Sequence, residues 1–245
     1  MSAPRFYCTP PITYDDTFEL PTEAAHHAIR VLRLRVNDPV QIFDGEGNAF
    51  DATLSEIIGK KVVLGNLKRC PEDFQSSLHI ILAHSMCSSE KMDWVMQKAT
   101  ELGAAEIQPV QTQRSVARLT SERAEKRVEH WRAVTIAACE QSGRNTLPEV
   151  GLPIEYSELL TQMRNDSGGK FILDPEGSTR LQQQAQLKGG VTLLVGPEGG
   201  FSSEEILMAR QVGFVPIQLG RCVLRTETAA LAGIAALQTL WGDFN

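Results

Sequence analysis

The sequence predicts an α/β protein in which a small antiparallel β-barrel precedes an α/β domain with a mainly parallel sheet. Two changes in pattern support this class. Up to about residue 70, short strand-like runs are separated by Gly, Asn and Asp. From His79 onward, apolar strand-like runs alternate with amphipathic helical stretches, which is typical of parallel strands joined by crossover helices. The divide predicts domains at residues 1–72 and 73–245.

The first domain is expected to hold one helix and three strands. The helix is predicted over 22–33, where Ala25, Ile29 and Leu32 recur at helical spacing. The strands alternate polar and apolar residues or carry β-branched runs, and they are predicted at 40–45, 49–57 and 61–68.

The second domain is expected to alternate between strands and helices. Its strands are predicted at 78–86, 105–111, 170–174, 191–196 and 214–220. Its helices are predicted at 90–102, 121–141, 202–212 and 227–240. The first of these helices ends at Gly103, a residue type that commonly follows a helix. The short run LQQQAQ at 181–186 is expected to form a polar helix face.

Composition excludes several classes of protein. A chain of 245 residues with 42% hydrophobic and 22% charged residues is typical of a folded globular protein. The longest apolar run covers only the nine residues from Ala229 to Leu237, about half the roughly 18 that a membrane-spanning helix needs. The start of the chain has no basic segment leading into an apolar one, so we expect a cytoplasmic protein.

The charges and cysteines are also informative. A net charge of −6 argues against sequence-blind coating of nucleic acid but leaves room for a local basic face. Five widely spaced cysteines without a CxxC pair predict no disulfides, and the five histidines never stand near two cysteines at zinc-ligand spacing. No metal is therefore expected.

The segment Leu193–Glu205, LLVGPEGGFSSEE, is the most informative part of the chain. An apolar strand ends in a glycine-rich turn, and Ser202 and Glu205 then stand at the spacing of a capping box that opens a helix. Ligands of open α/β sheets bind at the carboxyl ends of strands, where glycines allow close backbone approach. The turn lacks the lysine of a phosphate loop, and its Glu198 would repel phosphate. An ordinary glycine loop is the alternative.

Two further strands end in a similar way. The strand before Leu219 leads into Gly220, two arginines and a helix rich in small residues, while the strand at 170–174 leads into Asp174-Pro-Glu-Gly. Three strand ends of one type predict a single composite pocket.

Four segments in this order resemble the ribosomal RNA small-subunit methyltransferase E family. They are GPEGGFSSEE (196–205), LGRCVLRTETA (219–229), MDWVMQKATELGA (92–104) and AACEQSGRN (137–145). The resemblance covers almost the whole chain, including Arg5-Phe6 and HHAIRVLRLRVND (26–38). It implies a methyltransferase that acts on ring nitrogen 3 of a uridine in 16S rRNA and uses S-adenosylmethionine.

The resemblance also implies a fold and an assembly. The family has an N-terminal PUA-like barrel and a C-terminal SPOUT domain whose last part is threaded into a deep trefoil knot, and it works as a homodimer. Residues that would line the cofactor by similarity are Leu173, Val195, Gly196, Pro197, Glu198, Gly199, Gly200, Leu219, Gly220, Cys222, Val223 and Leu224. Adenine can be recognised by backbone groups in an apolar slot, which suits such loops.

Methylation of a uridine nitrogen requires alignment of the reacting atoms and stabilisation of the uridine anion. Arg225, directly after the cofactor loop, is the first candidate donor to the uracil, and an ion pair with Glu227 or Glu198 is its structural alternative. Glu198 and Glu140 are candidate general bases. Glu198 could equally fix its loop by accepting backbone N–H bonds, and catalysis without a dedicated base is a further alternative.

Clustered basic residues are the candidate RNA contacts. They are Arg30, Arg33 and Arg35 on the barrel and Arg114, Arg118 and Arg144 on the α/β domain. Arg144 with Asn145 could belong to the partner subunit's side of the site. The chain departs from the family's pattern at two places: Cys87-Ser88-Ser89-Glu90-Lys91 replaces a Lys-Gly-Asp type of turn, and Cys222 stands where arginine is usual.

Two alternatives stay open at this point. One is an RNA-binding ribosome-assembly protein with a catalytically silent SPOUT fold, which would bind RNA but no cofactor. The other is a SPOUT enzyme that acts on a tRNA or on a ribose oxygen.

Overall fold

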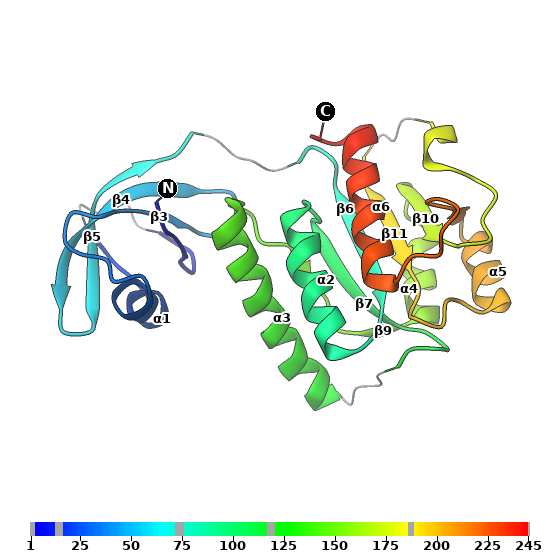
Figure 1. Ribbon diagram of the computed structural model, residues 1–245, viewed down its shortest axis with the longest axis horizontal. Coiled ribbons are helices and arrows are strands. Elements are labelled where there is room, and N and C mark those ends of the chain that lie inside the picture. Colours follow the sequence, from blue (N-terminus) through cyan, green and yellow to red (C-terminus); the bar gives the residue numbers. More distant parts are fainter. Residues whose placement is uncertain (1–2, 13–16, 72–75, 117–120, 186–188, 245) are drawn as a thin grey trace. The chain divides into compact units, whose positions relative to one another are not determined.

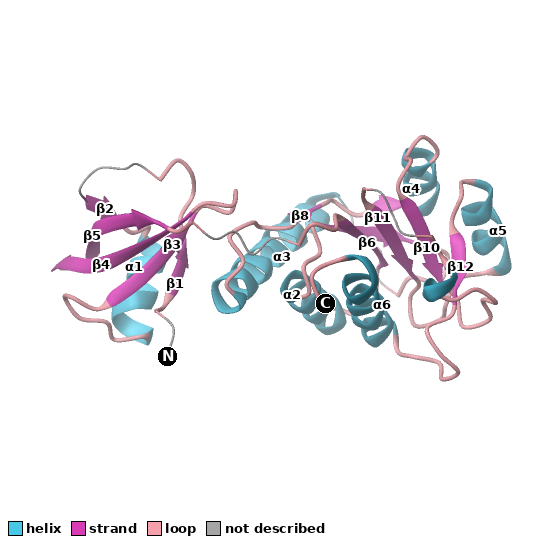
Figure 2. Cartoon of the chain, turned by 90° about the horizontal axis from the view of Figure 1, so that it is seen from above, coloured by secondary structure: helices cyan, strands magenta, loops and turns pink. Residues whose placement is uncertain are grey.

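The chain forms two compact units in the computed structural model, which describes residues 3–12, 17–71, 76–116, 121–185 and 189–244. The first unit comprises Met1–Gln75 together with Ile136–Leu147, and the second comprises Ser76–Thr135 and Pro148–Asn245. Figures 1 and 2 show the elements of both units. Among the described residues, no helix is long and apolar enough to cross a membrane.

The first unit contains a five-stranded sheet. Its strands are β1 (Arg5–Tyr7), β2 (Thr17–Glu19), β3 (Pro39–Phe43), β4 (Ala49–Ile58) and β5 (Lys61–Arg69). They lie in the order β1-β3-β4-β5-β2, and all pairs are antiparallel except β1 with β3. The three predicted strands are confirmed to within two residues. The sequence pattern missed β1 and β2 because runs of three residues are too short to show alternation.

The hairpin between β4 and β5 shows why the prediction succeeded there. Ile58 pairs with Lys61, so only Gly59 and Lys60 form the turn, and Gly59 has φ +65°. A two-residue hairpin turn of this kind needs a positive φ, which glycine adopts without strain. Alternate residues of both strands are buried, with Leu54 and Leu64 fully covered.

The predicted helix over 22–33 is wrong at its carboxyl end. The α-helix α1 covers Thr22–His26 and continues as a π-helical segment, η1 (His27–Val31). The Leu32 N–H donates to the His27 carbonyl, five residues back, at 3.0 Å. This wider turn rotates the following residues off the predicted face, so Leu32 is 41% exposed rather than buried.

The second unit contains a parallel sheet. Its strands are β6 (Ile80–Ser85), β7 (Glu106–Gln111), β8 (Glu149–Val150), β9 (Ile154–Glu155), β10 (Gly169–Leu173), β11 (Val191–Val195) and β12 (Val215–Ile217). The order is β12-β10-β11-β6-β7-β8, with β9 also pairing with β7, and every pair is parallel. The predicted α/β class is therefore confirmed.

Helices cover both faces of this sheet. They are α2 (Ser89–Glu101), the part of α3 (Ser121–Ser142) up to Thr135, α4 (Tyr156–Met163), α5 (Ser203–Gln211) and α6 (Thr226–Trp241). Figure 2 shows α2 and α6 on one face and α4 and α5 on the other. Each face has its own apolar core, and all five residues of β11 are buried between them. This explains why the central strands read as continuous apolar runs.

Two predicted elements of the second unit are wrong in extent. The strand predicted to 220 ends at Ile217, because the Gln218 N–H turns to the Thr179 carbonyl at 3.0 Å instead of continuing the ladder. The predicted polar helix at 181–186 is a single 3-10 turn, η2 (Leu181–Gln183), whose Leu181 is buried. The short elements α4, β8 and β9 were not predicted.

Candidate functional site: the strand tips of the parallel sheet

The three strand ends singled out in the sequence lie next to one another. Strands β12, β10 and β11 are neighbours and parallel, so their carboxyl ends share one edge of the sheet. Leu173, the last residue of β10, is in register with Ile217, the last residue of β12. The Asp174 N–H then donates to the Ile217 carbonyl at 3.0 Å, which ties the turn after β10 to the tip of β12.

The turn after β11 leads directly into α5. Its backbone closes through the Gly200 N–H, which donates to the Pro197 carbonyl at 2.8 Å, and Gly200 has φ +66°. The predicted capping box is confirmed: the Ser202 N–H donates to the Glu205 carboxylate at 2.8 Å, and the Glu205 N–H donates to the Ser202 hydroxyl at 3.3 Å. Both ends of the glycine turn are therefore fixed.

The glycines of the site differ in how much space surrounds them. A Cβ on Gly196 would lie 3.0 Å from the Phe201 ring, and a Cβ on Gly199 would lie 3.3 Å from the Arg114 side chain. Gly220 differs, because its φ is not in the left-handed range and a Cβ there would meet no protein atom within 4 Å. Neither backbone conformation nor internal packing therefore requires glycine at position 220.

Among the remaining predicted cofactor residues, Pro197 is buried and Leu219 is half-buried against the core, while the others are either buried or exposed. Leu173 and Val195 are buried, at 8% and 2% exposure, and form the floor at the ends of β10 and β11. Cys222, Val223 and Leu224 are exposed, with Val223 at 78%. The apolar side chains after β12 are thus left uncovered at the edge where the turns gather.

Glu198 in the glycine turn forms an ion pair that the sequence did not predict. Lys91 Nζ, from the first turn of α2, lies 3.0 Å from Glu198 Oε1 and 3.7 Å from Glu227 Oε2. Burial alone would raise the pKa of the Glu198 carboxyl, but its own backbone N–H and the Lys91 ammonium outweigh burial and lower that pKa. Glu198 is therefore held ionised at neutral pH.

The two arginines nearest this turn have separate positions. Arg225 is the N-cap residue of α6 and is exposed. Within the described parts of the chain it makes no ion pair with Glu227 or Glu198, which pair with Lys91 instead. Arg114 is also exposed, and its Nη1 donates to the Gly199 carbonyl at 2.7 Å. One predicted RNA contact thus touches the glycine turn.

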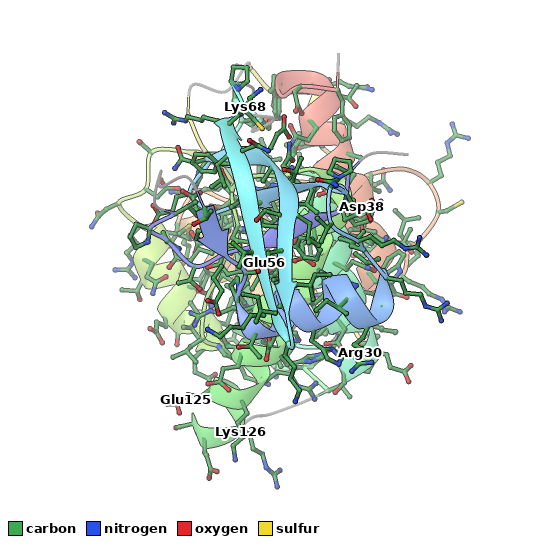
Figure 3. The ribbon with its side chains drawn as sticks, turned by 90° about the vertical axis from the view of Figure 1, so that its left-hand side faces the viewer. Arg30, Asp38, Glu56, Lys68, Glu125 and Lys126 are labelled. Atoms are coloured by element: carbon green, nitrogen blue, oxygen red, sulfur yellow. The ribbon has the colours of Figure 1, made fainter. Side chains whose placement is uncertain are left out.

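Other predicted residues lie in the first unit. Arg30, Arg33 and Arg35 are exposed around η1. The expected place of Arg144 on the α/β domain is wrong, because residues 136–147 pack with the first unit, and Arg144 is only 7% exposed. Figure 3 shows Arg30 near the helix and Lys68 at the far end of the β4–β5 pair. Arg118 lies outside the described residues.

Glu140 also belongs to the first unit. Its carboxylate accepts the Tyr7 N–H at 3.0 Å, and burial raises the pKa of this carboxyl. Its assignment as a general base stays a prediction.

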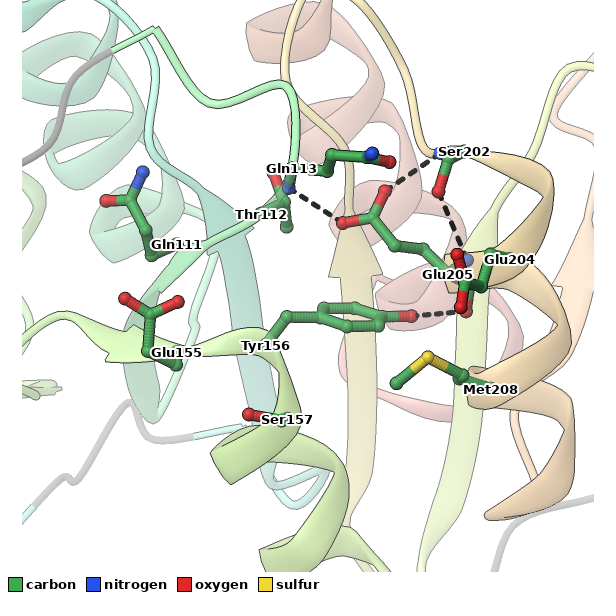
Figure 4. A pocket seen from close by; sticks show the side chains of 10 residues that line it. All are labelled: Gln111, Thr112, Gln113, Glu155, Tyr156, Ser157, Ser202, Glu204, Glu205 and Met208. Atoms are coloured by element: carbon green, nitrogen blue, oxygen red, sulfur yellow. Dashed lines mark hydrogen bonds between the residues drawn. The ribbon is translucent and has the colours of Figure 1, made fainter.

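A separate hollow of about 280 Å³ opens beside the carboxyl end of β7 (Figure 4). Tyr156 crosses it, with its hydroxyl donating to the Glu205 carbonyl at 2.7 Å, and the Glu205 carboxylate accepts the Gln113 N–H at 2.9 Å. None of the predicted cofactor residues lines this hollow.

Comparisons with known proteins identify the family. Residues 74–238 match the RNA methyltransferase domain family, and residues 20–65 match the RNA methyltransferase PUA domain family. The chain is 32% identical over 242 residues to the ribosomal RNA small subunit methyltransferase E of Buchnera aphidicola subsp. Schizaphis graminum, which covers 99% of this chain and 98% of that one. The chain belongs to the ribosomal RNA small subunit methyltransferase E family.

Solved structures agree with this family assignment. The Neisseria gonorrhoeae ribosomal RNA small subunit methyltransferase E, determined with bound S-adenosyl methionine, has a TM-score of 0.93 and 39% identity, with both chains fully covered. A Legionella pneumophila protein in complex with the cofactor SAM has the same TM-score, 34% identity and full coverage of both chains. For this member of the methyltransferase E family, sequence reasoning missed Lys91, His84 and Thr226 near the glycine turn. The only signal for His84 was a polar residue directly after the apolar run 80–83.

Proposed function

We propose that the protein transfers the methyl group of S-adenosylmethionine to N3 of a uridine in 16S rRNA of the small ribosomal subunit. The observation that carries the proposal is the gathering of three glycine- or leucine-bearing strand ends at one edge of a parallel sheet. Family membership and the SAM-bound Neisseria gonorrhoeae relative support it.

The residues at this edge fit the cofactor. Gly220 faces open space although nothing in the protein requires glycine there, which is expected where a ligand approaches the backbone. Buried Leu173 and Val195, together with exposed Val223 and Leu224, offer apolar surface for adenine. When bound, the cofactor supplies an activated methyl group on a sulfonium. Gly196–Gly200 and Leu219–Leu224 are the segments of this chain that would hold it.

Arg225 is the proposed donor to the uracil carbonyl oxygens. Its guanidinium makes no ion pair with Glu198 or Glu227 in the part of the chain that the structure describes, and it follows the cofactor segment directly. A cation aimed at those oxygens stabilises the anion that forms when N3 loses its proton. Lys91 supports this role, because it pairs with the two carboxylates that could otherwise hold Arg225.

The proton of N3 needs an acceptor, and the two candidate carboxylates differ. Glu198 has a lowered pKa and is held by Lys91, so it is ionised but weakly basic. Glu140 has a raised pKa, which suits a base better, while its carboxylate is engaged by the Tyr7 N–H. We propose Glu198 as a residue that shapes the turn, with solvent taking the proton from a uridine already acidified by Arg225.

We also propose which surfaces contact RNA. Arg30, Arg33 and Arg35 present exposed guanidinium groups on the PUA-like domain, predicted at 1–72, and Arg114 does so at the glycine turn. Arg118 and Arg144 complete the predicted set. The target uridine would be turned out of its surroundings to reach the pocket.

Two properties of the family are proposed for this chain as well. A homodimer is supported by exposed apolar side chains on two neighbouring helices, Trp94 on α2 at 42% and Leu240 on α6 at 37%. A trefoil knot is supported by the return of the chain from β12 to the tip of β11, where Thr226 contacts Gly196. A ribosomal substrate would place the protein in the cytoplasm.

Calorimetry and a methyl-transfer assay together test the proposal. The protein should bind S-adenosylmethionine and should transfer labelled methyl groups to small subunits from cells that lack its gene, with the product mapped as N3-methyluridine. Undetectable binding at millimolar cofactor would instead favour the catalytically silent RNA-binding alternative. Label on tRNA or on a ribose oxygen would favour the other SPOUT activities.

A further inference from the structure

Two buried side chains, those of His84 and Thr226, meet at the start of the glycine turn. His84 of β6 is fully buried and in register with Val195, the last residue of β11. Its Nε2 lies 3.3 Å from the hydroxyl of Thr226, the first residue of α6, which is 6% exposed. The same hydroxyl donates to the Gly196 carbonyl at 2.5 Å. Thr226 thus connects the start of α6 to the first residue of the glycine turn.

The protons in this cluster can be assigned. The second ring nitrogen, Nδ1, lies 2.8 Å from the Ser85 carbonyl, which can only accept a hydrogen bond. Burial lowers the pKa of His84, and the short contact with the Ser85 carbonyl places a ring proton on Nδ1. The Thr226 hydroxyl has a single proton, and the Gly196 carbonyl can only accept. This proton therefore lies in the 2.5 Å bond to Gly196 and is not available to Nε2.

The Gly196 carbonyl controls the geometry of the turn. It belongs to the Gly196–Pro197 peptide plane, which is rigid, and the proline ring fixes the next φ. Val195 on the other side is locked in the buried sheet at 2% exposure. Glycine itself has the widest backbone freedom of any residue. The rotation about Gly196 is thus the main soft torsion between the sheet and the turn, and the Thr226 hydrogen bond fixes it.

We propose that Thr226 is a positioning residue for the cofactor: its hydroxyl sets the Gly196–Pro197 peptide plane and thereby the shape of the Gly196–Gly200 turn. The inference rests on the proposed function, because that turn is expected to form one wall of the cofactor pocket. Backbone groups that read adenine bind well only when they are held in place beforehand. Without the hydroxyl, the turn samples several orientations and binds the cofactor more weakly.

Calorimetric titration of S-adenosylmethionine against three variants tests this role. Thr226→Val removes the hydroxyl at nearly constant shape, and Thr226→Ser keeps it. Thr239→Val on the same helix removes an exposed hydroxyl that bonds only to the Ala235 carbonyl. We expect Thr226→Val to raise the cofactor Kd at least tenfold, while Thr226→Ser and Thr239→Val stay within about threefold of the unmodified protein.

The melting temperature of each cofactor-free variant separates positioning from folding. A purely structural role would lower the melting temperature of Thr226→Val but leave its Kd unchanged well below that temperature, and this result would overturn the inference. Equal weakening by Thr226→Ser and Thr226→Val would also overturn it. If Thr226→Val does not fold, the comparison of Thr226→Ala with Thr226→Ser applies the same criterion. Failure of the unmodified protein to bind cofactor would refute the proposed function itself.

Discussion

Lys91 on α2 and Glu198 in the turn after β11 form an ion pair across 107 positions of sequence, with Nζ 3.0 Å from Oε1. The pair joins a helix that covers the sheet to the turn that we assign to the cofactor. It also explains why Glu198 is compatible with this turn, because the neighbouring ammonium compensates for the carboxylate charge. The side chains are about one-third exposed, so water and salt screen the attraction.

Replacement of this lysine should have a modest effect that depends on salt. Lys91→Met is expected to lower the free energy of unfolding by about 0.5 kcal/mol at low ionic strength, the scale of a partly exposed ion pair. Chemical denaturation in low and high salt measures it. Lys61→Met, which breaks the more exposed pair with Glu19, is the control and should cost less. An equal loss at all salt concentrations would show that packing, rather than charge, dominates.

Gly220 should tolerate alanine in the fold but not in the cofactor pocket. A Cβ at this position meets no protein atom within 4 Å, and the φ of Gly220 is outside the left-handed range. The melting temperature of the cofactor-free protein should therefore not fall. The added methyl group would occupy space that we assign to the ligand. We expect the Kd for S-adenosylmethionine to rise about tenfold or more, a loss of about 1.4 kcal/mol. Unchanged affinity would remove Gly220 from the cofactor site.

Arg225→Ala should reduce turnover far more than cofactor binding. If the guanidinium stabilises the uridine anion, its loss should lower kcat by about 100-fold or more, while the Kd for the cofactor changes little. Arg210→Ala is a matched control, since Arg210 on α5 is also exposed and lies outside the segments assigned to the cofactor. An unchanged rate at saturating substrate would exclude Arg225 from the mechanism.

Two carboxylates on neighbouring strands of the sheet make the stability of the protein depend on pH. Glu106 of β7 lies in register with Glu149 of β8, and burial together with Glu149 raises the pKa of the Glu106 carboxyl. The folded state therefore binds this proton more tightly than the unfolded state. The corresponding stability is present below the ordinary pKa near 4.5 and is lost as pH rises through the raised value.

Glu106→Gln should remove the free-energy cost of holding an ionised Glu106 carboxylate next to Glu149. We expect a gain of about 0.5 kcal/mol in the free energy of unfolding at pH 8, the scale of a like-charged pair on adjacent strands. The gain should disappear at pH 4, where the native carboxyl is protonated. Denaturant titrations at both pH values provide the measurement, and an equal effect at pH 4 and pH 8 would contradict the assigned cause.

The sequence predicted the parts of the fold that depend on local pattern. The apolar run at 191–195 and the capping box of Ser202 and Glu205 determine a buried strand and a helix start by themselves. The predicted end of the first helix was wrong because a π-helical segment at His27–Val31 changes the helical periodicity, and no local sequence signal indicates it. The strand predicted to extend to residue 220 is too long, because the Gln218 N–H donates a hydrogen bond to the Thr179 carbonyl and the chain leaves the sheet there.

The candidate site was predictable only in its turns. The glycine-rich composition of Gly196 to Gly200 indicated a turn, but the groups that hold this turn come from distant segments. Lys91, His84 and Thr226 are brought to it by the packing of α2, β6 and α6. Nothing in their local sequence indicates a partner 30 positions away, as for Thr226 and Gly196, or 107 positions away, as for Lys91 and Glu198.

Mass mapping of methylated uridines in 16S rRNA, with and without the gene, is the decisive test of the proposed methyl transfer. We expect one N3-methyluridine to disappear when the gene is deleted and to return when the unmodified gene is restored. Retention of every N3-methyluridine in the deletion strain would contradict it.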